Sequence, residues 1–118
     1  MTKGTTSAAA PWVVMRAHND RPLVDQTLAA LTRQTRPYRL LAMDNASADG
    51  TRQALSTIAE RVLDVPAGQY IPGRVLNQGM RATDGEIVVF LNADCTPAHD
   101  DWLARLLAPL EDPGVAAV

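Results

Sequence analysis

The stretch Ile87-Val88-Val89-Phe90-Leu91-Asn92-Ala93-Asp94 decides the fold class of this chain. Five consecutive apolar residues predict a strand that is buried on both faces, as the strands of parallel sheets are. Asn92 and Asp94 then emerge at the carboxyl end of that strand, where open α/β sheets bind their ligands. A hard divalent cation such as Mg2+ is commonly held by one or two carboxylates together with substrate phosphates. Asp94 is therefore the first candidate metal ligand.

Short apolar runs alternate with helical patterns along the chain from Pro11 onward. This alternation is typical of repeated βαβ units, and it predicts an α/β fold with a Rossmann-like, mostly parallel sheet and helices on both faces. Strands are predicted at residues 12–15, 40–43, 63–65, 87–91 and 115–118.

Four helices are predicted between these strands. The first is capped by Asn19 or Asp20. A later one opens at Thr51, and the last is capped by Asp100 or Asp101. Their inward stripes, in chain order, are Val24, Leu28 and Leu31; Leu55, Ile58 and Val62; Val75, Leu76, Gly79 and Met80; and Leu103, Leu106, Leu107 and Leu110.

Length and composition indicate a single ordinary domain. The chain has 118 residues, of which 47% are hydrophobic and 20% charged, with 11 basic against 13 acidic side chains. This balance argues against a disordered protein and against a nucleic-acid partner. We expect residues 1–10 to be a disordered leader and residues 11–118 to form the domain.

Cysteine content and hydropathy bear on location. Cys95 is the only cysteine, so it cannot form an internal disulfide, and a reducing, cytoplasmic compartment is expected. A small, buried, apolar role is the usual use of a free cysteine. No apolar run reaches the roughly 18 residues needed to span a bilayer, so no transmembrane segment is expected.

The chain ends on an apolar run at residues 115–118, where a new strand is predicted. A domain seldom ends on a strand whose edge has no partner. Two interpretations stay open. Either the chain is a fragment of a longer protein, which we favour, or the terminal strand pairs with a second copy and makes a homo-oligomer.

Four ordered motifs resemble the amino-terminal half of family 2 glycosyltransferases. They are VVMRAHND at residues 13–20, MDNASADGT at 43–51, NQG at 77–79 and GEIVVFLNAD at 85–94. Each one falls at a predicted strand end or helix start. The resemblance implies the GT-A fold and the nucleotide-sugar-binding half of a transferase that uses a nucleotide-diphosphate sugar of the UDP, GDP or dTDP type.

The resemblance also implies substrate-binding residues. Ala17, His18 and Asn19 correspond to the loop that borders the base, and Asp44 with Asn45 to the pair that contacts the uracil ring or ribose. Asp44 and Ser47 also fit an ordinary turn before a helix, and the two roles are compatible. Asn77 takes the place of an Arg-Asn pair in the family, where the basic residue is missing here; Arg74 or Arg81 is a candidate replacement.

The metal site implied by the resemblance departs from the family pattern. Asp94 matches the last aspartate of the Asp-x-Asp motif, which binds Mn2+ or Mg2+ bridging the two phosphates of the donor. Asn92 stands at the first position of that motif and removes one negative charge. In the family, the catalytic base comes from a part of the fold that corresponds to residues beyond 118, so no catalytic residue is assigned here and the chain alone is expected to be inactive.

Two other function classes compete with this interpretation. The chain can be a non-catalytic nucleotide-binding or self-associating module, with Asn92 marking a weakened metal site. A nucleotidyltransferase is disfavoured, because the loop after the first predicted strand, RAHND at residues 16–20, contains no glycine.

Overall fold

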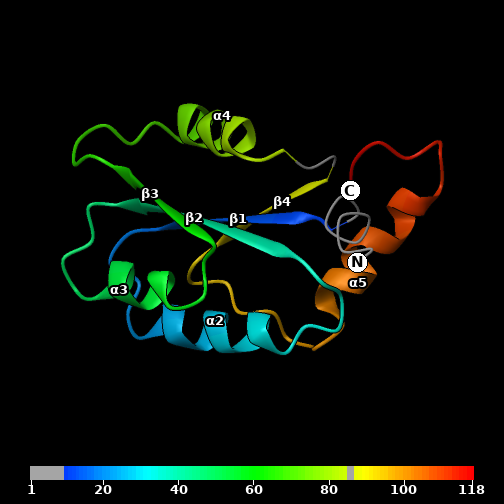
Figure 1. Cartoon of the computed structure of the whole chain (residues 1–118), viewed down its shortest axis with the longest axis horizontal. Coiled ribbons are helices and arrows are strands. Elements are labelled where there is room, and N and C mark those ends of the chain that lie inside the picture. Colours follow the sequence, from blue (N-terminus) through cyan, green and yellow to red (C-terminus); the bar gives the residue numbers. More distant parts are fainter. Residues whose placement is uncertain (1–9, 85–86) are drawn as a thin grey trace.

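The computed structural model describes residues 10–84 and 87–118. Four strands, β1 (Trp12–Ala17), β2 (Arg39–Asn45), β3 (Arg61–Val65) and β4 (Val88–Asn92), form one parallel sheet in the order β3-β2-β1-β4 (Figure 1). The α/β class and the parallel sheet predicted from the sequence are confirmed. The predicted leader lies outside the described residues, apart from residue 10.

The strand register brings all four carboxyl ends to one rim of the sheet, which we call the carboxyl edge. At the end of β1, Arg16 pairs with Asn92 of β4, and Ala17 pairs with Asp44 of β2. On the far side of β2, Asn45 pairs with Val65. The loops that follow the strands therefore leave the sheet side by side, because parallel strands end on the same edge.

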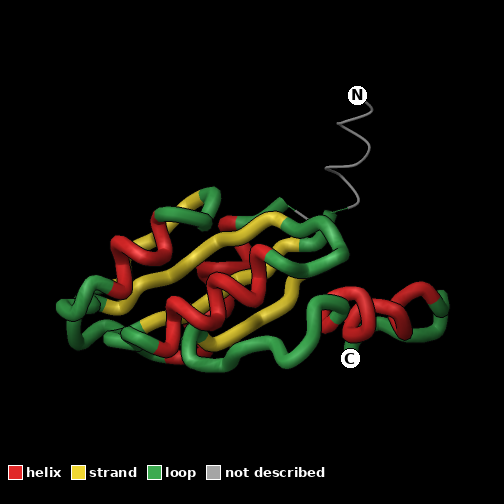
Figure 2. Tube along the Cα trace, turned by 90° about the horizontal axis from the view of Figure 1, so that it is seen from below, coloured by secondary structure: helices red, strands yellow, loops and turns green. Residues whose placement is uncertain are grey.

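Helices cover both faces of the sheet (Figures 1 and 2). On one face, α2 (Leu23–Thr32), α3 (Thr51–Ser56) and α5 (Trp102–Leu107) pack onto β1 and β2, and a short 3-10 helix η1 (Ala108–Glu111) follows α5. The other face is covered by α4 (Pro72–Ala82). The inward stripe of α2 is confirmed, since Val24, Leu28 and Leu31 are all buried.

Glycine in α4 allows the helix to approach the sheet closely. A Cβ atom at Gly79 would lie 2.8 Å from Val14 Cγ1 and 3.1 Å from Met43 Sδ. Trp12 anchors the other end of this layer, because its indole Nε1 donates to Asp84 Oδ1 over 3.0 Å while the Arg39 guanidinium stacks 4.2 Å from the ring centroid. Trp12 is 5% exposed and packs in the hydrophobic cluster on this face of the sheet.

Two predictions about strands are wrong. β4 is not buried on both faces: among the described residues it pairs only with β1, and Phe90 is 38% exposed. Residues 115–118 form no strand. Apolar sequence alone does not create a strand, because the ladder also needs a partner with unpaired backbone groups.

Helix boundaries also differ from the predictions. α3 ends at Ser56, and Val62 lies in β3 opposite Ala42, so the predicted stripe through Ile58 and Val62 is wrong. α2 begins at Leu23, with Pro22 at the N-cap position and no side-chain cap, so the predicted capping by Asn19 or Asp20 is also wrong. Asp101 does occupy the N-cap position of α5, but neither it nor Asp100 makes the predicted capping hydrogen bond. None of the described helices has the length and apolar character needed to cross a bilayer.

Candidate functional site

Polar side chains join the loops after β1 and β2 at the carboxyl edge. Asn19 is central to this contact, because its backbone N–H donates to Ser47 Oγ over 2.9 Å and its Oδ1 accepts from the Ala48 N–H over 2.7 Å. Nearby, the Asp20 N–H donates to Thr51 Oγ1 over 2.8 Å. Asn19 adopts a left-handed conformation with φ 49, which asparagine tolerates well. The two loops therefore form one unit, and Asn19 positions it.

His18 links the same two loops and remains exposed. Its Nδ1 donates to the backbone oxygen of Asn45, since a carbonyl oxygen can only accept. Asn19 Nδ2 lies 3.3 Å from Nε2 of the same ring. The imidazole is thus held at the end of β2, and its exposed ring offers a surface for a planar ligand.

Asp44 ends the buried part of β2 and is only 1% exposed. Ser47 satisfies its carboxylate, through Oγ at 2.6 Å and the backbone N–H at 3.1 Å. The turn predicted for these two residues is confirmed. The next residue, Asn45, has a buried Oδ1 without a hydrogen-bond partner among the described residues. An orphaned buried acceptor is unusual and marks a place where a ligand or water completes the site.

Beside β1, Asn92 is bound by an arginine that the sequence analysis did not single out. Arg16 Nη2 donates to Asn92 Oδ1 over 2.7 Å, and Arg16 Nη1 donates to the Tyr70 hydroxyl over 3.2 Å. The carbonyl oxygen of Asn92 is therefore engaged by a cation, which makes it unsuitable as a ligand for a second cation. Asp94 makes no such contact with Arg16, so of these two residues only Asp94 keeps its side-chain oxygens available to a cation.

Asp94 follows β4 and is exposed. The Ala93 N–H donates to the Arg16 oxygen over 3.0 Å, which holds the start of this turn against β1. The only hydrogen bond that reaches the Asp94 carboxylate from a described residue is a weak one from Cys95 Sγ at 3.6 Å. Within residues 10–84 and 87–118, no three His, Cys, Asp or Glu residues are grouped as a metal site. A cation at Asp94 would need ligand atoms from a phosphate, as is usual for Mg2+.

Cys95 differs from its predicted buried role, because its side chain is exposed. Desolvation, followed by the neighbouring carboxylate of Asp94, raises the pKa of its thiol. The thiol therefore stays protonated near neutral pH when no metal is bound.

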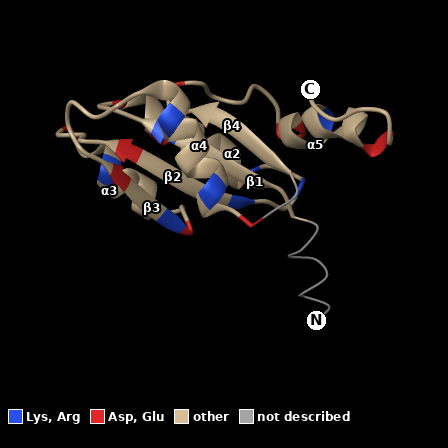
Figure 3. Cartoon of the chain, turned by 90° about the horizontal axis from the view of Figure 1, so that it is seen from above, with Lys and Arg blue, Asp and Glu red and all other residues tan. Residues whose placement is uncertain are grey.

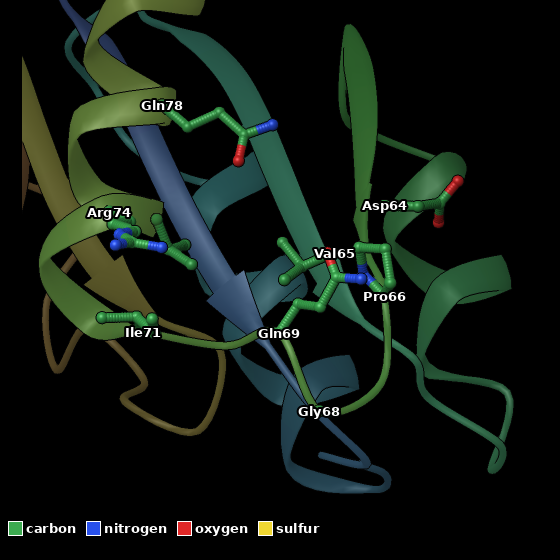
Figure 4. Close-up of a pocket in the computed structure, with 9 residues that line it drawn as sticks. Asp64, Val65, Pro66, Gly68, Gln69, Ile71, Arg74 and Gln78 are labelled. Carbon is green, nitrogen blue, oxygen red and sulfur yellow. The ribbon is translucent and has the colours of Figure 1, made fainter.

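A cavity of about 490 Å³ opens between the end of β3 and α4 (Figure 4). Arg74 and Gln78 line it from α4, while Gln69 lines it from the loop after β3. The carboxylate of Asp64 points away from this space and pairs with Arg52 Nε at 2.6 Å. The volume of the cavity lies in the range of roughly 300 to 1,000 Å³ that is typical of small-molecule sites.

The cavity distinguishes the residues that were proposed on α4. Arg74 lines it and Arg81 does not, because α4 runs antiparallel to the strands and only its first turns reach the carboxyl edge. Asn77 is exposed and does not line the cavity, and no hydrogen bond joins it to the other described site residues. Figure 3 shows the acidic end of β2 beside α3, whose only charged residue is Arg52.

Sequence reasoning missed Arg16, Tyr70 and the cavity. Arg16 carried a usable signal, since it is the only charged residue in the run from Trp12 to Ala17, which forms β1. Charged side chains are rarely buried in a strand unless they have a partner, so this arginine indicates a specific contact. Tyr70 and the cavity depend on how the loop after β3 folds back, which has no local signature.

Comparison with known proteins identifies a family that this chain matches over most of its length. Residues 12–118 match the family described as Glycosyl transferase family 2. Glycosyltransferase AglE of Haloferax volcanii is 31% identical over 116 residues, covering 90% of this chain and 37% of that protein. The O-antigen chain rhamnosyltransferase WbaN of Salmonella anatum is 30% identical over 91 residues, covering 75% of this chain and 29% of that protein.

Solved structures show the same fold. The mannosyltransferase PcManGT from Pyrobaculum calidifontis, in complex with GDP-Man and Mn2+, superposes with a TM-score of 0.75 at 28% identity, covering 89% of this chain and 33% of that chain. The present chain thus spans about a third of the length of the relatives it matches.

Proposed function

This chain belongs to glycosyl transferase family 2, and from that premise we propose that it forms the donor-binding part of a metal-dependent glycosyltransferase. The donor is a nucleotide-diphosphate sugar of the UDP, GDP or dTDP type. The observation that carries the proposal is the register of the sheet, which brings Asp44, Asn92 and the turn before Asp94 to the two sides of the β1 end.

The nucleoside is assigned to the region between β2, β3 and α4. His18 and Asn45 border it from the strand ends, and the cavity lined by Gln69, Arg74 and Gln78 provides amide and guanidinium groups for the polar edges of a base and ribose. Asp44 contacts the base in this proposal only after a small opening of the turn, because its carboxylate is 1% exposed. Ala17 contacts the nucleoside only through its backbone in this proposal, since its side chain is buried.

The diphosphate is assigned to the space beside β4, with Asp94 as the protein ligand of Mn2+ or Mg2+. The residues fit such an ion, because the carboxylate is exposed and is bonded only by the Cys95 thiol among the described residues. A divalent ion there offsets the negative charge that develops on the departing diphosphate. PcManGT, at 28% identity, was solved with both GDP-Man and Mn2+, which supports this assignment.

No described residue is assigned as the base that deprotonates the acceptor hydroxyl. A base must lie within hydrogen-bond reach of that hydroxyl, and the acceptor is not identified. We propose that transfer activity requires a region beyond this chain. The cytoplasmic location expected from the single cysteine stays a prediction.

A calorimetric panel tests the proposal. The folded chain is titrated with UDP, GDP and dTDP, each with EDTA and with Mn2+. We expect one nucleotide to bind more tightly than the others, and Mn2+ to strengthen that binding. If no nucleotide binds in either condition, the donor site is wrong; if one binds with no response to Mn2+ or Mg2+, the non-catalytic nucleotide-binding alternative is favoured.

A further inference from the structure

Arg16 places a positive charge at the carboxyl edge, in the middle of the sheet. Arg16 is the second-last residue of β1. The other side chains of this strand are all buried, and that of Arg16 is half-buried. Two of its five N–H donors bind Asn92 and Tyr70. Its Nε is buried and has no acceptor among the described residues. The guanidinium therefore has unused hydrogen-bonding capacity.

No carboxylate among the described residues forms an ion pair with Arg16. The ion pairs among the described residues involve Arg21, Arg33, Arg39, Arg52 and Arg105, and none of them includes Arg16. Both of its hydrogen-bond partners are neutral side chains. A partly buried cation without a counter-ion is costly, so this position favours an anionic ligand.

Asn92 explains how the guanidinium is held without being neutralised. An amide oxygen at 2.7 Å orients Arg16 as a carboxylate would, but leaves its full charge available. An aspartate at position 92 would form an ion pair with Arg16 and cancel the attraction for an anion. The neutral residue in place of the first acidic position is thus matched to the arginine on the neighbouring strand.

We propose that Arg16 binds the diphosphate of the donor directly, as the main protein cation of the site. This inference rests on the function proposed above. Arginine suits the task because its planar array of donors matches phosphate oxygens. The hydrogen bond to Tyr70 further links Arg16 to the loop after β3, whose residues Gln69 and Ile71 line the cavity. One residue thereby connects the phosphate region with the nucleoside region.

The test compares a nucleoside diphosphate with its nucleoside. Using whichever of UDP, GDP or dTDP binds the wild type, affinities are measured by calorimetry in EDTA, so that no metal contributes. Arg16→Met is expected to weaken the diphosphate at least tenfold and to change the affinity of the matching nucleoside by less than about twofold, because a charge-assisted hydrogen bond acts only on the phosphate. Increasing salt should weaken wild-type binding more than binding to Arg16→Met.

Arg33→Met is the matched control. Arg33 is exposed, pairs with Asp100 at 3.4 Å, and lies at the end of α2 away from the carboxyl edge. Its replacement should leave both affinities unchanged. Equal loss of nucleoside and diphosphate in Arg16→Met would show a purely structural role and overturn the inference, as would an unchanged diphosphate affinity.

If Arg16→Met fails to fold, Asn92→Asp tests whether Arg16 binds the diphosphate. The new carboxylate faces the guanidinium, and it should lower diphosphate affinity in EDTA at least fivefold while leaving the nucleoside unaffected. Unchanged diphosphate affinity in this variant would contradict a role for the free charge of Arg16. A wild type that binds no nucleotide in EDTA or Mn2+ would instead refute the proposed function itself, and this result is distinct from the two variant outcomes.

Discussion

The carboxylate of Asp94 carries the metal part of the proposal, because it is exposed and lies in the turn that the Ala93 N–H ties to β1. Asp94→Asn is expected to abolish the strengthening of nucleotide binding by Mn2+ while leaving affinity in EDTA unchanged or slightly higher, since an amide is a poor ligand for a hard cation. Calorimetry with and without Mn2+ measures this. Asp100→Asn is the control and should retain the metal response, because Asp100 is exposed, precedes the N-cap of α5 and pairs with Arg33.

A retained Mn2+ response in Asp94→Asn would exclude Asp94 as the ligand. It would direct attention to other exposed acceptors at the carboxyl edge, and Asn92 would remain a poor candidate because Arg16 already occupies its oxygen.

Ala46 is strained in the turn between β2 and α3. Its φ is 49, in the left-handed region that a Cβ atom disfavours by about 1 to 2 kcal/mol. Glycine removes this cost but loses about 0.5 to 1 kcal/mol of chain entropy. Ala46→Gly is therefore expected to raise the free energy of unfolding by up to about 1.5 kcal/mol, as measured by urea denaturation.

Ala48 provides the matched control in the same turn. It is exposed as Ala46 is, but its φ is not positive, so Ala48→Gly should lower stability by about 0.5 to 1 kcal/mol. Equal effects of the two substitutions would contradict the strain at Ala46.

Helix α4 depends on one small residue for its distance from the sheet. A methyl group at Gly79 would meet Val14 Cγ1 at 2.8 Å and force the helix away. Gly79→Ala should destabilise the protein by about 1 to 3 kcal/mol through overpacking, even though alanine has the better helix propensity. Urea denaturation measures the change.

Gly73 lies in the same helix and isolates the packing effect. Nothing lies within 4 Å of a Cβ built there, so Gly73→Ala should be neutral or stabilising by up to about 1 kcal/mol. If Gly79→Ala proved as mild as Gly73→Ala, the close approach of α4 to β1 and β2 would be wrong.

At the level of helices and strands, the sequence predicted the order of the elements better than the residues at which they end. The stripe of α2 and the start of α3 at Thr51 followed from local periodicity and turn residues. The end of α3 did not, because Val62 fits a helical stripe and a strand equally well. Its position was settled by pairing with Ala42, which is distant in the chain.

Two solvent-exposed ion pairs beside β3, Arg52 with Asp64 and Arg39 with Glu60, respond to pH. Arg52 lowers the pKa of Asp64, and Arg39 lowers the pKa of Glu60, in each case first through a hydrogen bond. A carboxylate with a lowered pKa in the folded state adds stability above its unfolded pKa, and that stability is lost as the pH falls through the folded value. The free energy of unfolding should therefore decrease as the pH drops below about 4.5.

Removal of one partner tests this dependence. Asp64→Asn should flatten the decline in stability between pH 5 and pH 3, and Arg52→Met should flatten it to a similar extent, because each removes the same pair. Urea denaturation across this range, at constant ionic strength, gives the slope. An undiminished slope in both variants would show that the pair does not persist in solution.

Much of the molecule follows from the sequence by itself. Local periodicity and turn chemistry determined the order of strands and helices, the parallel α/β class and the position of Asp44, Asn92 and Asp94 at strand ends, because these signals span only a few residues. Tertiary structure alone decided which of these side chains face one another. Parallel pairing sets Arg16 beside Asn92 and leaves β4 at the edge of the described sheet, and the packing of loops buries Asp44 while leaving Cys95 exposed. These outcomes depend on register and burial between distant segments, which no short window of sequence encodes.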